Sequence, residues 1–296
     1  MGKAIKIGTI SQCNELLHEK TQHPLISIID LGGDTYMPAL QMEFYAILLR
    51  DNASCHDTNG WQKCDYCDAT LITLSPEKLI TIESSGMLQA NKGHLLIFHP
   101  LLLHGLPTEG VMKECLFFDF KFNEALHLSA REYHILLAAF CDIRAELHWG
   151  IDEYSRIILV NKLELLLNYC RRFYRRQFIT RQETNRNIIS QTENIIENYF
   201  LSAKTCHNGM PSIETIARTL NLSKAYLETL LRYETGNSST EFIQKKRIEI
   251  ARRQLLHTNK SIHDIACGLG FGSAQHFCHL FKKLTGYAPL AYRLQN

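Results

Sequence analysis

Two stretches near the C-terminal end of the chain share one helix-turn-helix pattern, residues 212–236 and residues 261–286. In the second stretch, Ser261 is placed to cap a helix, Ile265 lies on its apolar face, and Gly286 ends a second helix after a glycine-bearing turn. The first stretch aligns with it when one extra residue is allowed after the turn of the second copy. A single such pattern is weak, but two copies in register predict paired helices here.

A basic helix is predicted to join the two copies, from about Ser239 to Leu256. Its apolar face consists of Phe242, Ile243, Ile250 and Leu255, and its basic side chains are Lys245, Lys246, Arg247, Arg252 and Arg253. At a rise of ~1.5 Å per residue this helix spans ~27 Å. That length suits two recognition helices separated by roughly one turn of DNA, ~34 Å.

The second helix of each copy presents a polar face between its apolar positions, as helices that enter the DNA major groove do. The predicted DNA contacts are Lys224, Ala225, Tyr226, Glu228, Thr229 and Arg232 in the first copy, and Ser273, Ala274, Gln275, His276, His279, Lys282 and Lys283 in the second. The first set contains an acidic residue, Glu228, which repels phosphates, while the second set contains none. Gln275 is expected to read adenine.

Residues 185–296 resemble the DNA-binding domain of AraC/XylS-type transcription regulators. The resemblance rests on the I-A-x(3)-G-F run of Ile265 to Phe271, the F-K-K-x-T-G run of Phe281 to Gly286, Pro289, and Tyr292–Arg293. It implies a sequence-specific regulator, an activator, that binds double-stranded DNA and works with RNA polymerase. It also implies a homodimer and control by a small-molecule effector.

The charge distribution agrees with a polyanionic partner. Residues 1–170 contain 13 Lys and Arg against 21 Asp and Glu, a net charge of −8, whereas residues 171–296 contain 19 against 9, a net charge of +10. No signal peptide is expected after Met1, and no apolar run approaches the ~20 residues that span a bilayer. Ten scattered cysteines without a framework spacing indicate free thiols in a reducing cytoplasm.

Short strands are predicted in the N-terminal part, at Leu25–Leu31, Glu43–Leu49, Ala69–Leu74, Leu79–Ile82, His94–Phe98 and Cys115–Phe120. Their spacing is typical of a barrel or sandwich. The resemblance implies a cupin-like β-barrel over residues 1–125, which would bind the effector. The expected fold class is therefore a multidomain α+β protein with a DNA-binding domain at residues 185–296.

From Ser129 onward the apolar period becomes helical, which predicts two antiparallel helices within residues 126–182. Residues 122–129 and 165–178 resemble the helical part of the same family's companion domain. A two-heptad seam of Leu159, Leu163, Leu166 and Phe173 has to be buried either on the barrel or on another subunit, and it is predicted to form the dimer interface. The basic residues that follow have two readings, a solvated helix end and linker, which we favour, or direct DNA contact; they are Arg171, Arg172, Arg175, Arg176 and Arg181.

Two clusters of possible ligating side chains have alternative interpretations. Cys55, His56, Cys64 and Cys67 have one zinc-like C-x-x-C spacing without a second matched pair, so incidental thiols are favoured over a metal site. Histidines at 94, 99 and 104 lack the H-x-H spacing of metal cupins. His99 and His104 either line a ligand pocket or are structural, the latter being favoured.

No catalytic motif such as G-x-S-x-G, a Walker loop or H-E-x-x-H occurs. We therefore expect no metal, no cofactor and no enzymatic activity. The alternative functions are a cupin-type small-molecule binding protein and a metal-dependent cupin enzyme. Neither accounts for the duplicated helix-turn-helix pattern, and a DNA mobility-shift assay distinguishes both from a regulator.

Overall fold

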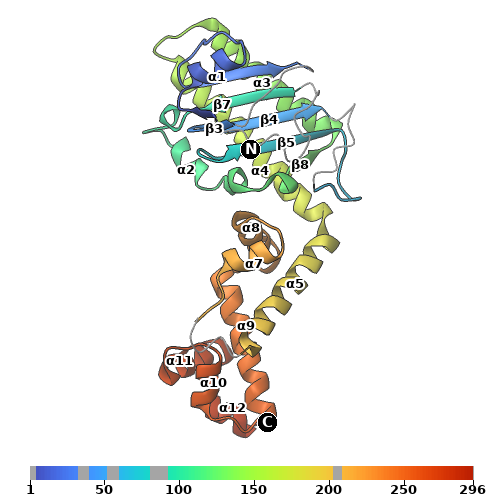
Figure 1. The fold of residues 1–296 in the computed structure, drawn as a ribbon, viewed down its shortest axis with the longest axis vertical. Helices are drawn as coiled ribbons and strands as arrows, with labels where there is room; N and C mark the ends of the chain where they lie inside the picture. The colour runs from blue at the N-terminus through green and yellow to red at the C-terminus, as the bar shows by residue number, and fades with distance from the viewer. Residues whose placement is uncertain (1–4, 33–39, 52–59, 81–92, 203–208, 296) are drawn as a thin grey trace. The chain divides into compact units, whose positions relative to one another are not determined.

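The chain forms two compact units, unit 1 (Met1–Arg181) and unit 2 (Gln182–Asn296). The structure, a computed structural model, describes residues 5–32, 40–51, 60–80, 93–202 and 209–295. Unit 1 combines strands and helices, and unit 2 is helical wherever it is described (Figure 1). The expected change from strands to helices along the chain is confirmed. No helix of the described ranges is long and apolar enough to cross a membrane.

An antiparallel sheet of five strands forms the centre of unit 1. In spatial order its strands are β2 (Ile26–Leu31), β7 (Gly93–Phe98), β4 (Tyr45–Asp51), β5 (Ala69–Leu74) and β8 (Leu126–Leu128). A smaller sheet joins β1 (Ile5–Ile7), β3 (Leu40–Met42) and β6 (Leu79–Ile80). Neither sheet closes into a barrel within the described residues, so the cupin-like barrel stays a prediction.

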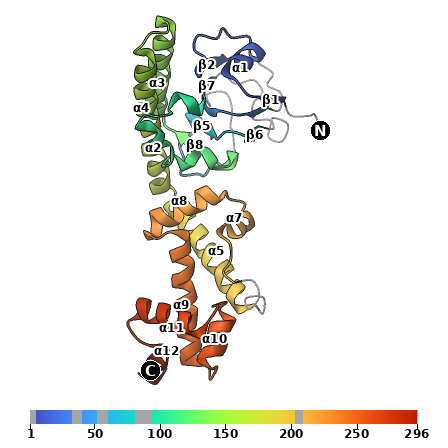
Figure 2. The ribbon, with the colours of Figure 1, turned by 90° about the vertical axis from the view of Figure 1, so that its left-hand side faces the viewer.

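Both faces of the five-stranded sheet are covered. Successive side chains of a strand point to opposite faces, and Leu48, Ile72 and Ile97 pack on one face with α1 (Ile10–Leu16) and β1. The alternate residues Ile47 and Leu96 are also buried. Helices lie over that second face, so α1 with the small sheet and the helical hairpin enclose the large sheet from opposite sides (Figure 2).

The predicted helical hairpin is α3 (Ala130–Trp149) followed by α4 (Ser155–Thr180). Ser129 caps α3 in a capping box with Glu132, in which each side chain bonds the other residue's backbone N–H. Gly150 ends α3 with a φ of 107°, which favours glycine. Short elements before the hairpin are η1 (Pro100–Leu102), α2 (Thr108–Met112), η2 (Leu116–Asp119) and η3 (Phe122–Glu124).

Two local predictions for this region were wrong. Residues 115–120 do not form a strand but contain the 3-10 helix η2, and the adjacent Phe117 and Phe118 are both buried. Thr73 Oγ1 of β5 donates to the carbonyl of Phe117 at 2.7 Å and the Ser75 N–H to that of Phe118 at 3.1 Å, in place of a regular strand ladder. Residues 122–129 are not helical throughout, since 126–128 form β8. The helix α1 was not predicted at all.

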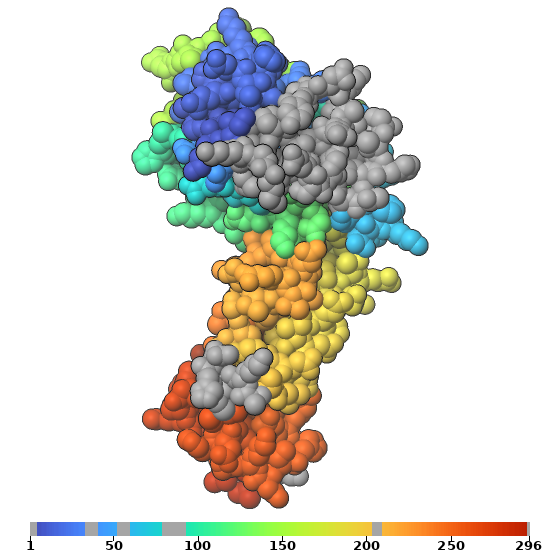
Figure 3. Space-filling view, viewed as in Figure 1, coloured from blue at the N-terminus to red at the C-terminus, as the bar shows by residue number. Residues whose placement is uncertain are grey.

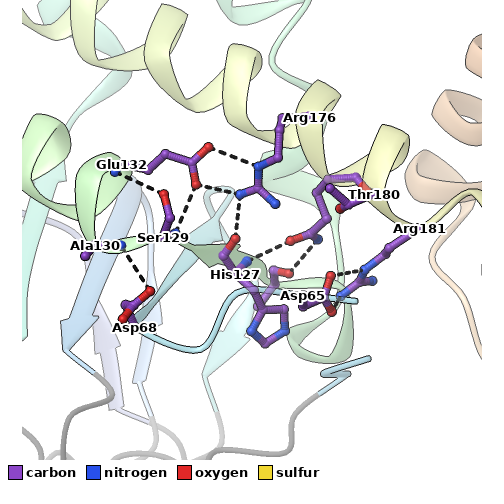
Figure 4. A network of polar contacts seen from close by, with 11 residues as sticks. Asp65, Asp68, His127, Ser129, Ala130, Glu132, Arg176, Thr180 and Arg181 are labelled. Atoms are coloured by element: carbon purple, nitrogen blue, oxygen red, sulfur yellow. Dashed lines mark hydrogen bonds and ion pairs between the residues drawn. The ribbon is translucent and has the colours of Figure 1, made fainter. Parts of the chain in front are cut away.

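A polar network holds the end of α4 against the rest of unit 1 (Figure 4). Arg181 Nε lies 2.9 Å from Asp65 Oδ1, and its Nη2 donates to the carbonyl of Gly60 at 3.0 Å. Arg176 forms an ion pair with Glu132 at 2.7 Å and stacks on the ring of Tyr66. Arg171 pairs with Glu114. Arg176 and Arg181 are thus engaged inside unit 1, whereas Arg172 and Arg175 are exposed on α4, as the favoured reading of a solvated helix end expects.

Unit 2 consists of α5 (Gln182–Leu201), α7 (Ile213–Thr219), α8 (Lys224–Thr235), α9 (Ser239–His257), α10 (Ile262–Gly268), α11 (Ala274–Thr285) and α12 (Pro289–Gln295). The helix α5 packs against α9, α7 and α8, and its yellow surface adjoins their orange surface in Figure 3. The helix predicted to join the two motifs is α9, with the expected apolar face buried. Leu284 at the end of α11 is exposed, and Pro289 begins α12, where its fixed φ suits a first helical residue.

Candidate nucleic-acid interface

Four serines start the helices of the two helix-turn-helix motifs. Ser212, Ser223, Ser261 and Ser273 each have an extended backbone and accept a hydrogen bond at Oγ from a backbone N–H in the first turn, at 3.0 to 3.2 Å. Such a cap satisfies one of the N–H groups that lack a partner within the helix. The predicted cap at Ser261 is confirmed.

The turns of the two motifs have the same backbone conformation. Asn221 and Gly270 both lie in the left-handed region, with φ of 57° and 70°. In each turn the next residue bonds back to an alanine carbonyl, Leu222 to Ala217 at 2.8 Å and Phe271 to Ala266 at 2.9 Å. Asparagine tolerates this conformation better than most residues and glycine adopts it freely. The duplication is therefore a duplication of geometry as well as of sequence.

Each second helix ends in the same way. Gly236 and Gly286 follow α8 and α11 with φ of 70° and 83°, and their N–H groups donate to the carbonyls of Arg232 and Lys282. Glycine at this position ends a helix sharply without a Cβ clash. The predicted role of Gly286 is confirmed, and the same signal bounds both recognition helices.

The helix α11 presents a polar, basic face opposite a buried aromatic one. Phe277 and Phe281 are fully buried in the core of unit 2. The exposed predicted contacts are Gln275, His276, His279, Lys282 and Lys283, while Ala274 is half-buried. Ser273 is exposed too, but its Oγ already caps the helix by accepting from the His276 N–H. The structure thus gathers most of the second predicted set on one face.

The first recognition helix, α8, offers fewer free side chains than predicted. Lys224 and Arg232 are exposed, Ala225 is half-buried, and Tyr226 is buried. Glu228 accepts a hydrogen bond from the hydroxyl of Ser239 at 3.2 Å, so its carboxylate is directed to the start of α9. Thr229 Oγ1 donates to its own helix, at the carbonyl of Ala225. The structure leaves Lys224 and Arg232 as the exposed cations of this set.

Most basic residues of α9 contact unit 2 itself, which sequence reasoning missed. Lys246 pairs with Glu193 of α5 at 2.8 Å, and Arg253 pairs with Glu197 at 2.8 Å. The two glutamates lie four residues apart on α5 and their two basic partners lie seven apart on α9, so no matched spacing in the sequence signalled these pairs. Arg247 is buried, and Arg252 donates to the hydroxyl of Tyr292. The positive charge of α9 therefore serves helix packing as well as any polyanion.

The histidines considered for ligand binding have local partners. His99 Nδ1 accepts from the Leu101 N–H at 3.2 Å and caps η1. His104 has a side chain that is 77% exposed, 3.9 Å from Glu109. His94 Nδ1 lies 2.6 Å from Asp30 Oδ1. These placements match structural and surface roles, and a ligand pocket at His99 and His104 stays a prediction.

The cysteine cluster is only partly described. Cys64 and Cys67 are exposed thiols ahead of β5, while Cys55 and His56 lie outside the described residues. In the described part of the chain, no group of three His, Cys, Asp or Glu side chains is arranged to hold a metal ion.

The predicted dimer seam is not available at the surface. Leu159, Leu163, Leu166 and Phe173 are all buried inside unit 1. The physical reason is that α3 and β8 pack against α4 and cover the stripe that the sequence left open. The prediction that these four side chains meet a second subunit is therefore wrong.

Known proteins resemble unit 2. A family of helix-turn-helix domains matches residues 216–295. The regulatory protein SoxS of Salmonella typhimurium is 33% identical over 82 residues, which cover 28% of this chain and 77% of SoxS. The bifunctional transcriptional activator/DNA repair enzyme AdaA of Bacillus subtilis is 34% identical over 82 residues, again 28% of this chain but only 39% of AdaA.

One solved structure is also similar in sequence. The C-terminal domain of AraT, a response regulator from Geobacillus stearothermophilus, has 30% sequence identity, and the match covers 37% of this chain and 85% of that one, with a TM-score of 0.32. The match to SoxS extends over most of that protein, and the motif geometry described above occurs twice within residues 216–295, which the helix-turn-helix family matches. The chain belongs to the AraC family of DNA-binding transcriptional regulators.

Proposed function

We propose that this chain is a sequence-specific transcription activator that binds promoter DNA through both helix-turn-helix motifs. The observation that carries the proposal is the left-handed turn conformation shared by Asn221 and Gly270, each followed by a capped helix with exposed cations. The 19 residues of α9 span ~28 Å at ~1.5 Å per residue. That length suits contacts in two successive major-groove segments ~34 Å apart. The family resemblance further suggests that the protein acts together with RNA polymerase in the cytoplasm.

The two motifs contribute differently to this activity. The helix α11 contains no acidic residue and exposes several donors, so it reads bases and contacts phosphates. The helix α8 supplies Lys224 and Arg232, which suit backbone phosphates better than base edges. Sequence specificity therefore comes mainly from residues 273–283. The DNA-binding domain is assigned to residues 185–296.

Residues 1–125 are proposed to act as a cupin-like sensory domain for a small organic effector, without a metal. The support is the family resemblance together with the missing H-x-H spacing in the sequence. Stoichiometric zinc or iron in protein purified without added metal would contradict the metal-free part. If residues 180–296 activated transcription as the intact protein does, the sensory role would be wrong.

We propose a homodimer through the hairpin within residues 126–182, using side chains other than the predicted seam. Several large apolar residues of this hairpin are exposed, among them Trp149, Ile151, Ile157 and Leu165. A second copy of the chain is the natural occupant, because a two-fold axis makes one patch self-complementary. Dimerisation would place two DNA-binding units on one operator.

Selection of binding sites from random DNA by the full-length protein tests the proposal. We expect enrichment of one sequence, and footprinting should then show two protected segments about one helical turn apart. A mobility-shift assay against unrelated DNA serves as the control. Failure to enrich any sequence, with the protein folded, would favour the alternative of a small-molecule binding protein.

A further inference from the structure

One charged side chain lies in the core of unit 2. Arg247 of α9 is only 4% exposed, and its Nε donates to the carbonyl of Leu269 at 2.7 Å. Its guanidinium carbon lies 3.3 Å from the centre of the Phe271 ring and 5.8 Å from that of Phe200. The terminal nitrogen Nη2 is buried without a hydrogen-bond partner among the described residues. Burial lowers the pKa of Arg247 to about 10, so the group stays protonated near neutral pH.

A contribution to stability does not explain why an arginine is buried at this position. A buried cation normally pairs with a carboxylate, but no ion pair joins Arg247 to an acidic residue in the described ranges. Apolar residues of similar volume often replace buried ions without loss of stability. The stack on Phe271 and the bond to Leu269 offset part of the desolvation cost. What an apolar residue would not supply is a directional contact with a particular backbone carbonyl.

The contacts of Arg247 join the two halves of unit 2. Leu269 and Phe271 flank Gly270, the left-handed residue that shapes the turn between α10 and α11. Phe200 belongs to α5, which packs against the first motif at α7 and α8. One planar group therefore lies between the helix that supports the first motif and the turn that aims the second.

The first motif has no equivalent cation on its own supporting helix. When α5 is aligned with α9 so that Ile188 and Ile195 match Ile243 and Ile250, Thr192 falls opposite Arg247. Thr192 is buried and donates to the carbonyl of Ile188 in its own helix at 2.8 Å. The contact to a turn is therefore specific to the second motif.

We propose that Arg247 is a positioning residue that sets the orientation of α11 relative to α8, and so the spacing of DNA segments that both helices can bind together. The proposal rests on the proposed sequence-specific binding. A planar guanidinium is needed, because it stacks on a ring with its face while it donates from Nε in its own plane. Lysine would keep the charge and lose both contacts.

The test uses full-length protein and three DNA duplexes. One carries the selected site, and two carry the same site with one base pair inserted or deleted between the protected segments. The wild type should lose about tenfold in affinity on either altered duplex, comparable to one mismatched base pair. In Arg247→Met the affinity for the selected site should fall, and the penalty for altered spacing should shrink to about twofold. Arg247→Lys should behave as Arg247→Met does.

The spacing ratio is the affinity for the selected site divided by the affinity for an altered duplex. A change in stability alone would not change this ratio, because a smaller folded fraction lowers binding to all three duplexes equally. Ile250→Ala on the same helix is the matched control: it removes buried side-chain volume and should keep the wild-type ratio. If Arg247→Met does not fold, Phe271→Leu removes the stacking ring instead and should also flatten the spacing preference.

The outcomes separate the two proposals. A wild-type spacing ratio in Arg247→Met, or equal wild-type affinity for all three duplexes, would overturn the role of Arg247 while leaving sequence-specific binding intact. Absence of any selected site for the wild-type protein would overturn the proposed function itself, and the role of Arg247 with it.

Discussion

Gln275 and Lys282 are both exposed on α11, but their side chains suit different parts of DNA. The amide of Gln275 can pair bidentately with adenine, whereas the ammonium of Lys282 is a point charge for phosphate. Gln275→Ala should therefore cost ~1–3 kcal/mol at one base pair and relax specificity there. Lys282→Ala should weaken binding to all sequences and lower the salt slope by ~1.

Binding measurements on a set of operator variants at several salt concentrations check this pair, with each variant as the control for the other. Equal loss on every operator variant for Gln275→Ala would mean that the amide positions the helix and reads no base. An unchanged salt slope for Lys282→Ala would remove it from the phosphate contacts.

The buried pair of Asp65 and Arg181 matters to unit 1 in a different way. Both side chains are almost inaccessible, and Arg181 also donates to Gly60. Asp65→Ala would remove the carboxylate that pairs with this buried guanidinium, and breaking a buried ion pair typically costs about 3–5 kcal/mol. Urea unfolding of unit 1 should show a loss of that size, whereas the exposed Asp142→Ala should change stability little. Equal urea midpoints for the two variants would mean that the pair of Asp65 and Arg181 does not stabilise unit 1.

At the scale of secondary-structure elements, the caps show how one residue can have two roles. Ser273 was predicted to contact DNA, and its Oγ caps α11. Ser273→Ala should lower the free energy of unfolding of unit 2 by about 1 kcal/mol, while Ser273→Asn should retain most of it. Thermal unfolding measures the stability and a mobility-shift assay the binding. Full stability in Ser273→Ala would mean that the cap contributes nothing.

Strand prediction succeeded where a segment is bounded by its own turn signals. It failed where hydrogen bonds from side chains replace the backbone pairing of neighbouring strands. The prediction at Ala69–Leu74 matches β5 residue for residue. The run at Cys115–Phe120 has an equally strand-like composition, but its carbonyls bond to the Thr73 hydroxyl and to Lys78 Nζ. Both segments have a composition that favours a strand, so composition does not distinguish them. The distinction depends on neighbours far along the chain.

At the scale of the whole molecule, the hairpin offers two leucines with opposite expected behaviour. Leu163 is fully buried in unit 1, and Leu165 is 52% exposed on the same helix. Leu163→Glu should unfold unit 1, because it buries an unpaired charge. Leu165→Glu should leave unit 1 folded and convert the proposed dimer to a monomer, as measured by light scattering with circular dichroism for the fold. A Leu165→Glu protein that remains dimeric would place the interface elsewhere.

The two helix-turn-helix motifs could be predicted because their signals act within a few residues: serine caps, apolar spacing and glycines after the last turn. The identity of the exposed face of α11 followed from that period alone. The apolar stripe of α4 could be predicted from its periodicity, but the elements that cover it could not. In the structure, α3 and β8 pack on this stripe and bury it.

Tertiary structure alone decided where polar side chains point. Arg247 has the same place in the basic pattern as Lys245 and Arg252, yet it is buried because Phe200 and the turn at Gly270 pack around it. Glu228, predicted to face DNA, bonds instead to the hydroxyl of Ser239. Local patterns specify which face of a helix is apolar, because that depends on residues within two turns. The partner of a charged group depends on which distant segment folds against it, and only the assembled core determines that.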